Sequence, residues 1–195
     1  MVEYIAGIII CSRIDSRRVP AKPFRLIGGY CLIELLASRL TESGLPVYIA
    51  VPDSDLENYL FLKRIPRVYI EYGDNESPLE RMYRVAVKNN LDIIVRYNHD
   101  KVFADTETIK NAVEDFSKSQ DDYWYCDKIT KGAGFELFKT PVLALAYEKS
   151  KRPVEHITYA VRAVTNKLNS VQVSKDLISN HRLLIDYEED LTLIK

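Results

Sequence analysis

Residues 8–23 of the chain read IIICSRIDSRRVPAKP, an apolar run that passes directly into a basic loop. The run starts earlier, and Val2–Ile10 as a whole has the β-branched residues of a strand that is buried on both faces. The loop extends to residue 30, and its five cations against one acid, Asp15, give a local charge of +4. The five cations are Arg13, Arg17, Arg18, Lys22 and Arg25.

A cationic loop at the carboxyl end of a buried strand suits a polyphosphate, because parallel sheets bind ligands beyond that edge. The loop contains neither a GxxxxGKS/T nor a GxGxxG pattern. Cationic side chains, and not a glycine-rich backbone, would therefore have to hold the phosphates. The alternative is that these residues form a solvated surface, as most runs of charge do.

Strand and helix patterns alternate along the rest of the chain. Further strands are expected at 47–51, 67–70, 92–97, 123–126 and 182–185. Helices are expected at 31–42, 54–64 with Ser54 as N-cap, 77–89 with a capping box at Ser77-Pro78-Leu79-Glu80, 105–118, from 140, after 153 and at the C-terminus. This alternation predicts an α/β fold with a mostly parallel sheet. Without a repeat or a linker, we expect one domain over residues 1–195.

Composition narrows the class of protein. The 195 residues carry 27 Lys and Arg against 28 Asp and Glu, a net charge of −1 that argues against nucleic acid as a partner. The three cysteines contain no CxxC pair and leave one over in any disulfide scheme, which favours a reducing, cytoplasmic compartment. We expect no signal peptide and no membrane partner, because no segment approaches the roughly 20 apolar residues of a membrane span.

The basic loop resembles the opening motif of the nucleotide-sugar cytidylyltransferases, roughly A-R-x-x-S-x-R-x-P-x-K. The matching residues are Arg13, Ser16, Arg18, Pro20 and Lys22. The resemblance continues in order at PLERMYRVA (78–86), DIIVRYNHD (92–100), EHIT (155–158) and LIDYEEDL (184–191). Within this family, which also includes 3-deoxy-manno-octulosonate and N-acylneuraminate cytidylyltransferases, the chain resembles the spore coat polysaccharide biosynthesis protein F group.

The resemblance implies a three-layer α/β/α sandwich with a mostly parallel mixed sheet, the Rossmann-like fold of nucleotide-diphospho-sugar transferases. It also implies a reaction for surface polysaccharide biosynthesis. A hydroxyl of a sugar or sugar acid attacks the α-phosphate of CTP, and pyrophosphate leaves. The implied cofactor is Mg²⁺, the implied partners are CTP and the small acceptor, and the implied assembly is a homodimer.

The resemblance assigns the nucleotide side as follows. Arg13 and Lys22 are catalytic and bind the triphosphate, with Ser16 and Arg18 assisting, because an arginine fork and a lysine point charge both suit phosphate. Arg81 is expected near the cytidine. For each of these cations the alternative is a surface charge or an ordinary ion pair.

The metal and the acceptor are assigned on the same basis. Asp100 is expected to be catalytic, to contact the nucleotide and to bind Mg²⁺ together with Asp186, since both acids end a predicted strand. The alternative for such an acid, Asp186 in particular, is a helix cap. Glu136, Glu155 and His156 are expected on the acceptor side, although a lone histidine at a helix start is often structural and Glu136 alone could be a strand-edge charge.

Two segments depart from the family pattern. HDKV (99–102) stands where the family has G-D-x-P, so His99 replaces a glycine and Lys101 lies beside an expected metal ligand. KGAGFE (131–136) stands where the group has D-G-x-D-x-E, so two acids are absent. The sequence thus retains the phosphate side and alters the acceptor side.

Two other functions fit this pattern. One is a same-fold transferase with a different nucleotide or acceptor, such as a phosphorylated acceptor, or a glycosyltransferase whose D-x-D motif would be Asp53-Ser54-Asp55. The other is a non-catalytic nucleotide-binding protein that has lost its acceptor site.

Overall fold

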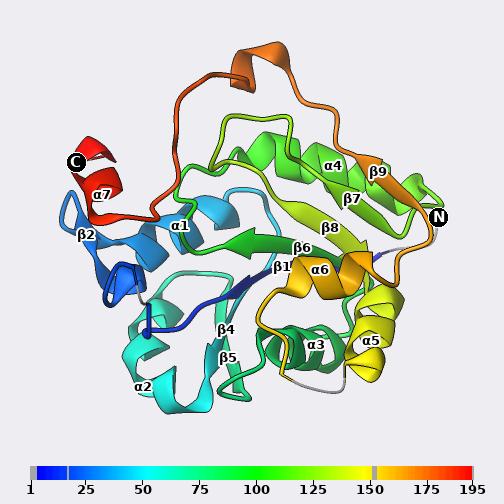
Figure 1. Ribbon diagram of the computed structural model, residues 1–195, viewed down its shortest axis with the longest axis horizontal. Helices are drawn as coiled ribbons and strands as arrows, with labels where there is room; N and C mark the ends of the chain where they lie inside the picture. Colours follow the sequence, from blue (N-terminus) through cyan, green and yellow to red (C-terminus); the bar gives the residue numbers. More distant parts are fainter. Residues whose placement is uncertain (1–3, 17, 151–152, 195) are drawn as a thin grey trace.

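The computed structural model describes residues 4–16, 18–150 and 153–194. The predicted strand residues 2 and 3, and Arg17 of the basic loop, lie outside these ranges. Seven strands form one sheet in the order β5-β4-β1-β6-β8-β7-β9 (Figure 1). The strands are β1 (Ala6–Cys11), β4 (Val47–Pro52), β5 (Val68–Gly73), β6 (Ile93–Asn98), β7 (Tyr123–Tyr125), β8 (Glu136–Lys139) and β9 (Leu168–Ser170).

The sheet is mixed and mostly parallel. β1 lies between β4 and β6, parallel to both, and β4 is parallel to β5. β8 runs antiparallel to β6 and β7, and β7 is parallel to β9. The carboxyl ends of β1 and β6 therefore lie at one edge of the sheet, where ligands bind in such folds.

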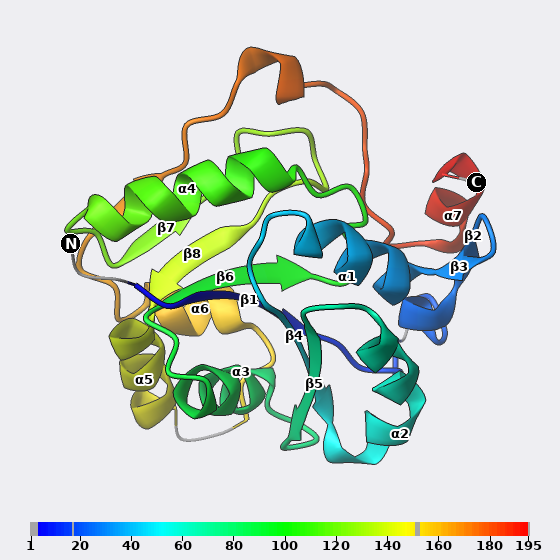
Figure 2. The same ribbon diagram turned by 180° about the vertical axis from the view of Figure 1, so that it is seen from behind.

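Helices cover both faces of the sheet, which makes three layers (Figures 1 and 2). The helices are α1 (Leu32–Thr41), α2 (Leu56–Tyr59), α3 (Pro78–Lys88), α4 (Thr106–Lys118), α5 (Thr140–Lys149), α6 (Ile157–Arg162) and α7 (Glu188–Ile194). α1 and α4 pack on one face, whereas α3, α5 and α6 pack on the other. β1 sends Ile8 and Ile10 to the first core and Ile9 to the second. The predicted α/β/α sandwich is confirmed.

Two helix starts follow their sequence signals. The hydroxyl of Ser77 accepts a hydrogen bond from the backbone N–H of Glu80 at 3.3 Å and so caps α3. The carboxylate of Asp105 accepts one from the N–H of Thr108 at 2.9 Å and caps α4. Each cap satisfies an N–H group that the helix itself leaves without a partner.

The expected single helix at 54–64 is wrong. Two 3₁₀ helices, Asp53–Asp55 and Leu60–Arg64, flank the short α2, and the Ser54 hydroxyl contacts the Asp55 side chain at 3.3 Å instead of a helix N–H. Apolar residues in this stretch recur at every third position from Leu56 to Ile65. That spacing matches the three residues per turn of a 3₁₀ helix, whose i and i+3 side chains share one face.

The expected last strand at 182–185 is also wrong. Within the described residues this segment makes a single bridge, Lys131 with Arg182, and the N–H of Ile185 donates to the carbonyl of Asp100 at 2.9 Å. Loop contacts replace a sheet partner because the segment crosses the carboxyl edge. The small hairpin of β2 (Leu26–Ile27) and β3 (Tyr30–Cys31) was not predicted, and neither were β8 and β9.

The C-terminal segment is fixed by Asp190. Its carboxylate accepts hydrogen bonds from the N–H groups of Asp186 and Tyr187, at 2.7 and 3.0 Å, and from the guanidinium of Arg182 at 3.1 Å. Arg182 above all, with these N–H groups, lowers the pKa of Asp190 to about 2. This carboxylate holds the loop that carries Asp186.

None of the helices in the described ranges has both the length and the apolar character that a membrane crossing needs.

We expect Ser77→Ala to lower the free energy of unfolding by about 1 kcal/mol, because α3 loses its cap. Ser54→Ala is the matched control and should change it by less than about 0.5 kcal/mol, since Ser54 caps nothing. Urea unfolding of both variants measures this. Equal losses in the two would contradict the assignment of the caps.

Asp190 should make stability depend on acid pH. Its folded pKa lies below its unfolded value, so the stabilisation is present above about pH 4 and is lost as the pH falls towards 2. Asp190→Asn should therefore be less stable than the wild type at neutral pH, and the difference should shrink between pH 4 and 2. Urea midpoints across this range measure the gap, and a gap independent of pH would contradict the argument.

Candidate active site

The basic loop and the turn after β6 enclose a cavity of about 260 Å³, here called the loop cavity. The residues that line it are Arg13, Asp15, Ser16, Arg18, Lys22, His99, Asp100 and Glu155. The predicted nucleotide side chains of the loop thus meet one predicted metal ligand and one predicted acceptor residue. Parallel pairing of β1 with β6 explains this, because the loops after both strands leave the sheet at the same edge.

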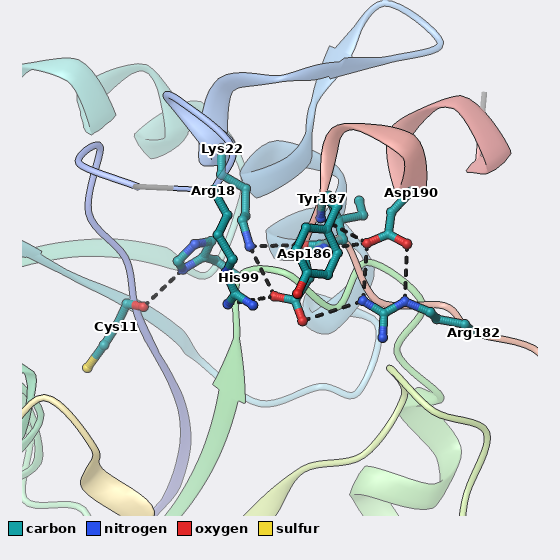
Figure 3. Close-up of polar contacts among 9 residues, drawn as sticks. Cys11, Arg18, Lys22, His99, Arg182, Asp186, Tyr187 and Asp190 are labelled. Carbon is teal, nitrogen blue, oxygen red and sulfur yellow. Dashed lines mark hydrogen bonds and ion pairs between the residues drawn. The ribbon is translucent and has the colours of Figure 1, made fainter.

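Among the loop cations that the structure describes, Lys22 is the most buried. It begins the 3₁₀ helix Lys22–Phe24 after Ala21, whose positive φ of 49° turns the chain inward, and it is 4% exposed. Its ammonium donates to the carbonyl of Ile185 at 2.6 Å and lies 3.5 Å from the carboxylate of Asp186 (Figure 3). A buried ammonium needs such partners to offset the loss of hydration.

Three cationic side chains surround the carboxylate of Asp186. Its carboxylate lies 3.0 Å from Arg18 and 3.5 Å from both Lys22 and Arg182 (Figure 3). The Arg18 guanidinium also lies over the ring of Tyr187, 5.5 Å from its centre. This arrangement joins residues of the first loop to the C-terminal segment and surrounds one carboxylate with positive charge.

The carboxylate of Asp100, unlike that of Asp186, has an oxygen without a partner among the described residues. Its buried Oδ1 accepts no hydrogen bond within the described part of the chain, which is costly for a carboxylate oxygen. The backbone N–H of Ile185 donates a hydrogen bond to the backbone carbonyl of Asp100, so the segment that carries Asp186 lies beside Asp100. A magnesium ion takes one or two carboxylates plus phosphate oxygens and water, and this donor set fits that requirement. No group of three His, Cys, Asp or Glu side chains suited to a metal occurs in the described ranges.

His99 fills the place where the family has glycine. A ring nitrogen, Nδ1, lies 3.3 Å from the carbonyl of Cys11 at the end of β1 (Figure 3). Burial lowers the pKa of His99 against the opposing effect of Asp100, and Lys22 and Arg13 lower it further. The imidazole is therefore neutral at physiological pH and adds no charge to the cavity.

Arg13 and Glu155 form an ion pair of 2.8 Å across the loop cavity. Both side chains are partly exposed, at 39% and 61%. The pair joins a predicted triphosphate ligand to a predicted acceptor residue. Arg13 must leave this partner if it is to contact phosphate with the same guanidinium nitrogen.

Four predicted site residues do not line the loop cavity: Asp186, which contacts its cations Arg18 and Lys22 as described above, and three residues that lie elsewhere. Arg81 is 2% exposed on α3, where it donates to the carbonyl of Asp74 at 2.6 Å and its Nε has no partner in the described ranges. His156 precedes α6, is exposed and packs edge-on against Tyr159. Glu136 lines a different cavity.

That second cavity, here called the β6–β8 cavity, measures about 390 Å³. Arg96 and Asn98 of β6 line it, with Lys101 of the following turn and Glu136 of β8. Arg162 of α6 also lines it, a residue that sequence reasoning missed. Arg162 lies four residues after Thr158 of the EHIT motif, which places both residues on one helix face. This spacing is the sequence signal that could have identified Arg162.

Known proteins are similar in sequence to most of the chain. The chain is 25% identical to a 3-deoxy-manno-octulosonate cytidylyltransferase of Rickettsia bellii over 89% of its own length, and it spans 65% of that relative. It is 24% identical to the spore coat polysaccharide biosynthesis protein SpsF of Bacillus subtilis over 96% of this chain and 83% of that one.

Solved structures share the fold. A cytidylyltransferase from Leptospira borgpetersenii superposes with a TM-score of 0.85 at 23% identity, covering 96% of this chain and 84% of that one. A CMP:2-keto-3-deoxy-manno-octonic acid synthetase complexed with CTP gives a TM-score of 0.68 at 15% identity, covering 97% and 96%. The cytidylyltransferase family model matches residues 7–191, nearly the whole chain. The chain therefore belongs to the cytidylyltransferase family of nucleotidyltransferases.

Proposed function

We propose that the protein is a Mg²⁺-dependent cytidylyltransferase that transfers CMP from CTP to a hydroxyl of a sugar or sugar acid for surface polysaccharide biosynthesis. In this step the acceptor hydroxyl releases its proton to solvent and its oxygen forms a bond to the α-phosphorus, while the bond from that phosphorus to the bridging oxygen breaks and pyrophosphate leaves with the electron pair. The loop cavity carries the proposal, because it combines cations for a triphosphate with a buried carboxylate oxygen that has no partner among the described residues.

The cations of the loop would neutralise and orient the triphosphate. Phosphoryl transfer depends mainly on placement and on charge stabilisation, so fixed cations supply most of what the reaction needs. Lys22 is fixed by burial, whereas Arg13 and Arg18 are more exposed and can turn towards phosphate. Ser16 lines the same cavity and would add a hydroxyl contact.

Asp100 and Asp186 would hold magnesium together with phosphate oxygens. The metal would neutralise charge that develops on the phosphates. Asp186 would exchange part of its contact with Arg18 for the metal, which releases that guanidinium towards the triphosphate. The homodimer stays a prediction, and a cytoplasmic location is favoured by the three free thiols.

The test begins with thermal stability in the presence of CTP, UTP, GTP or ATP, each with and without Mg²⁺. We expect CTP with Mg²⁺ to stabilise the wild type most, by about 2.7 kcal/mol at 100 times its Kd. Asp100→Asn should keep CTP binding, lose the enhancement by Mg²⁺ and reduce pyrophosphate release about 10²- to 10³-fold.

Asp53→Asn is the matched control for this variant. Asp53 is exposed in the 3₁₀ helix after β4, outside both cavities, and should leave pyrophosphate release unchanged. A fall in pyrophosphate release in Asp53→Asn would show that the effect of Asp100→Asn is not specific to the loop cavity, whereas turnover of a nucleotide sugar that Asp53→Asn abolishes would favour a D-x-D glycosyltransferase. Full activity of Asp100→Asn, or a preference for another nucleotide, would overturn the proposal.

Glu155→Gln should bind CTP more tightly, because it releases Arg13 for the triphosphate. An exposed ion pair contributes about 0.2–1 kcal/mol, so the expected gain in affinity is roughly 1.5- to 5-fold. Glu114→Gln breaks a comparable exposed pair with Lys118 on α4 and should not change CTP affinity. Calorimetric titration measures both, and weaker CTP binding by Glu155→Gln would show that Glu155 supports the nucleotide.

A further inference from the structure

The two cavities share the turn that follows β6. His99 and Asp100 line the loop cavity, whereas Asn98 and Lys101 line the β6–β8 cavity. A molecule bound in the β6–β8 cavity would therefore lie beside whatever occupies the loop cavity. This is the position that an acceptor must take under the proposed function, on which the inference below rests.

Within the β6–β8 cavity, one acid is fully engaged. The carboxylate of Glu136 accepts hydrogen bonds from Arg96 at 2.5 Å, from the Tyr123 hydroxyl at 2.7 Å and from the Thr158 hydroxyl at 2.8 Å. Burial tends to raise the pKa of Glu136, but Arg96 and these hydrogen bonds hold it below its ordinary value. Glu136 thus neutralises Arg96 and orients the side chains that contact it in the cavity wall. Its oxygens have little capacity left for a ligand.

Three further cations line the cavity without a carboxylate partner in the described part of the chain. The guanidinium of Arg162 lies over the rings of Tyr125 and Tyr123, with its carbon 5.2 and 5.8 Å from their centres. The ammonium of Lys101 donates to the carbonyl of Gly134 at 2.6 Å, and burial lowers its pKa. Lys131 lines the same cavity and is exposed.

The acid that remains is Asp127, which is exposed at the edge of the cavity. Three cations against one exposed acid leave a surplus of positive charge. Aromatic faces and a carbonyl hold two of these cations in place. A surplus of this kind in a concave site favours an anionic ligand.

The loop 131–134 explains how this charge arose. Lys131 and Gly134 stand at the two positions where the group has acids, and Gly134 lies against backbone. A Cβ at Gly134 would come within 2.2 Å of the Cys126 backbone oxygen. Position 134 therefore has no room for aspartate, and position 131 carries a cation in place of an acid.

The altered loop and the turn after β6 meet in one cavity. Lys131 belongs to the altered loop, whereas Lys101 belongs to the turn, at a position that the family pattern leaves open, and its ammonium donates to the carbonyl of Gly134 in that loop. The loop lacks two acids of the group pattern and carries a cation in place of one of them. Both changes make the charge of the cavity more positive.

We propose that the β6–β8 cavity is an anion subsite that binds the phosphomonoester of a phosphorylated sugar acceptor through Arg162, Lys101 and Lys131. A carboxylate carries one negative charge, whereas a phosphomonoester carries about −1.5 to −2 at pH 7 and offers three acceptor oxygens. Three cations that lack acidic partners in the described ranges match the phosphate better than the carboxylate. The planar guanidinium of Arg162 supplies the paired donors that phosphate accepts.

The test uses three matched hexoses with the full chain, in saturating CTP and Mg²⁺: glucose, glucuronate and glucose 6-phosphate. Calorimetric titration should give glucose 6-phosphate a Kd at least about tenfold below that of glucuronate, and glucose should show no binding. Arg162→Gln should weaken glucose 6-phosphate at least about tenfold, since a hydrogen bond to a charged group is lost. CTP affinity should stay unchanged.

Arg84→Gln is the matched control, because this exposed arginine on α3 lines neither the loop cavity nor the β6–β8 cavity. It should leave both affinities unchanged. Glucuronate binding as tight as glucose 6-phosphate, or unchanged glucose 6-phosphate binding in Arg162→Gln, would overturn the inference.

Titration of inorganic phosphate separates the two cavities. Phosphate that binds in the presence of saturating CTP supports the subsite, whereas phosphate that only competes with CTP occupies the loop cavity and overturns it. Failure of CTP to bind, with glucose 6-phosphate still bound and sensitive to Arg162→Gln, would reject the proposed function and keep the subsite. Normal CTP binding, with no binding of glucose 6-phosphate, would reject the subsite and keep the proposed function.

Discussion

The buried ammonium of Lys22 joins the loop after β1 to the C-terminal segment. It is 4% exposed, and its hydrogen bond to Ile185 spans 163 positions of sequence. Burying a cation without partners is costly. The buried position of Lys22 therefore requires the C-terminal segment, which supplies its partners, to stay beside it. The position of Asp186, and through it that of Arg18, follows from this one constraint.

Charge is distributed differently in the two cavities. Beside the loop cavity, cations surround Asp186, whereas Asp100 in that cavity keeps an oxygen without a partner among the described residues, so the proposed site combines anion and metal binding. In the β6–β8 cavity, Arg96 neutralises the charge of Glu136, and the other lining residues carry a net positive charge. The turn after β6 separates the two, because neighbouring side chains of one turn point to opposite sides of the strand end.

Much of the fold could be predicted from local patterns. Buried strands, the Ser77 cap and the Asp105 cap are properties of short segments, and the structure has them where expected. Prediction failed where tertiary contacts decide the backbone. Residues 53–64 form two 3₁₀ helices on either side of the short α2, and residues 182–185 bond to loops instead of a sheet edge.

The sequence by itself determined the family, the α/β order of elements and the cationic loop, because each depends on residues close together in the chain. Only the tertiary structure decided which side chains share a cavity. It separated Glu136 from the loop cavity, paired Arg13 with Glu155 and placed Arg162 and Lys101 in the lining of one cavity. The physical reason is that cavities form where loops from distant strands meet at one sheet edge, and the charge balance there is a sum over residues that no local pattern contains.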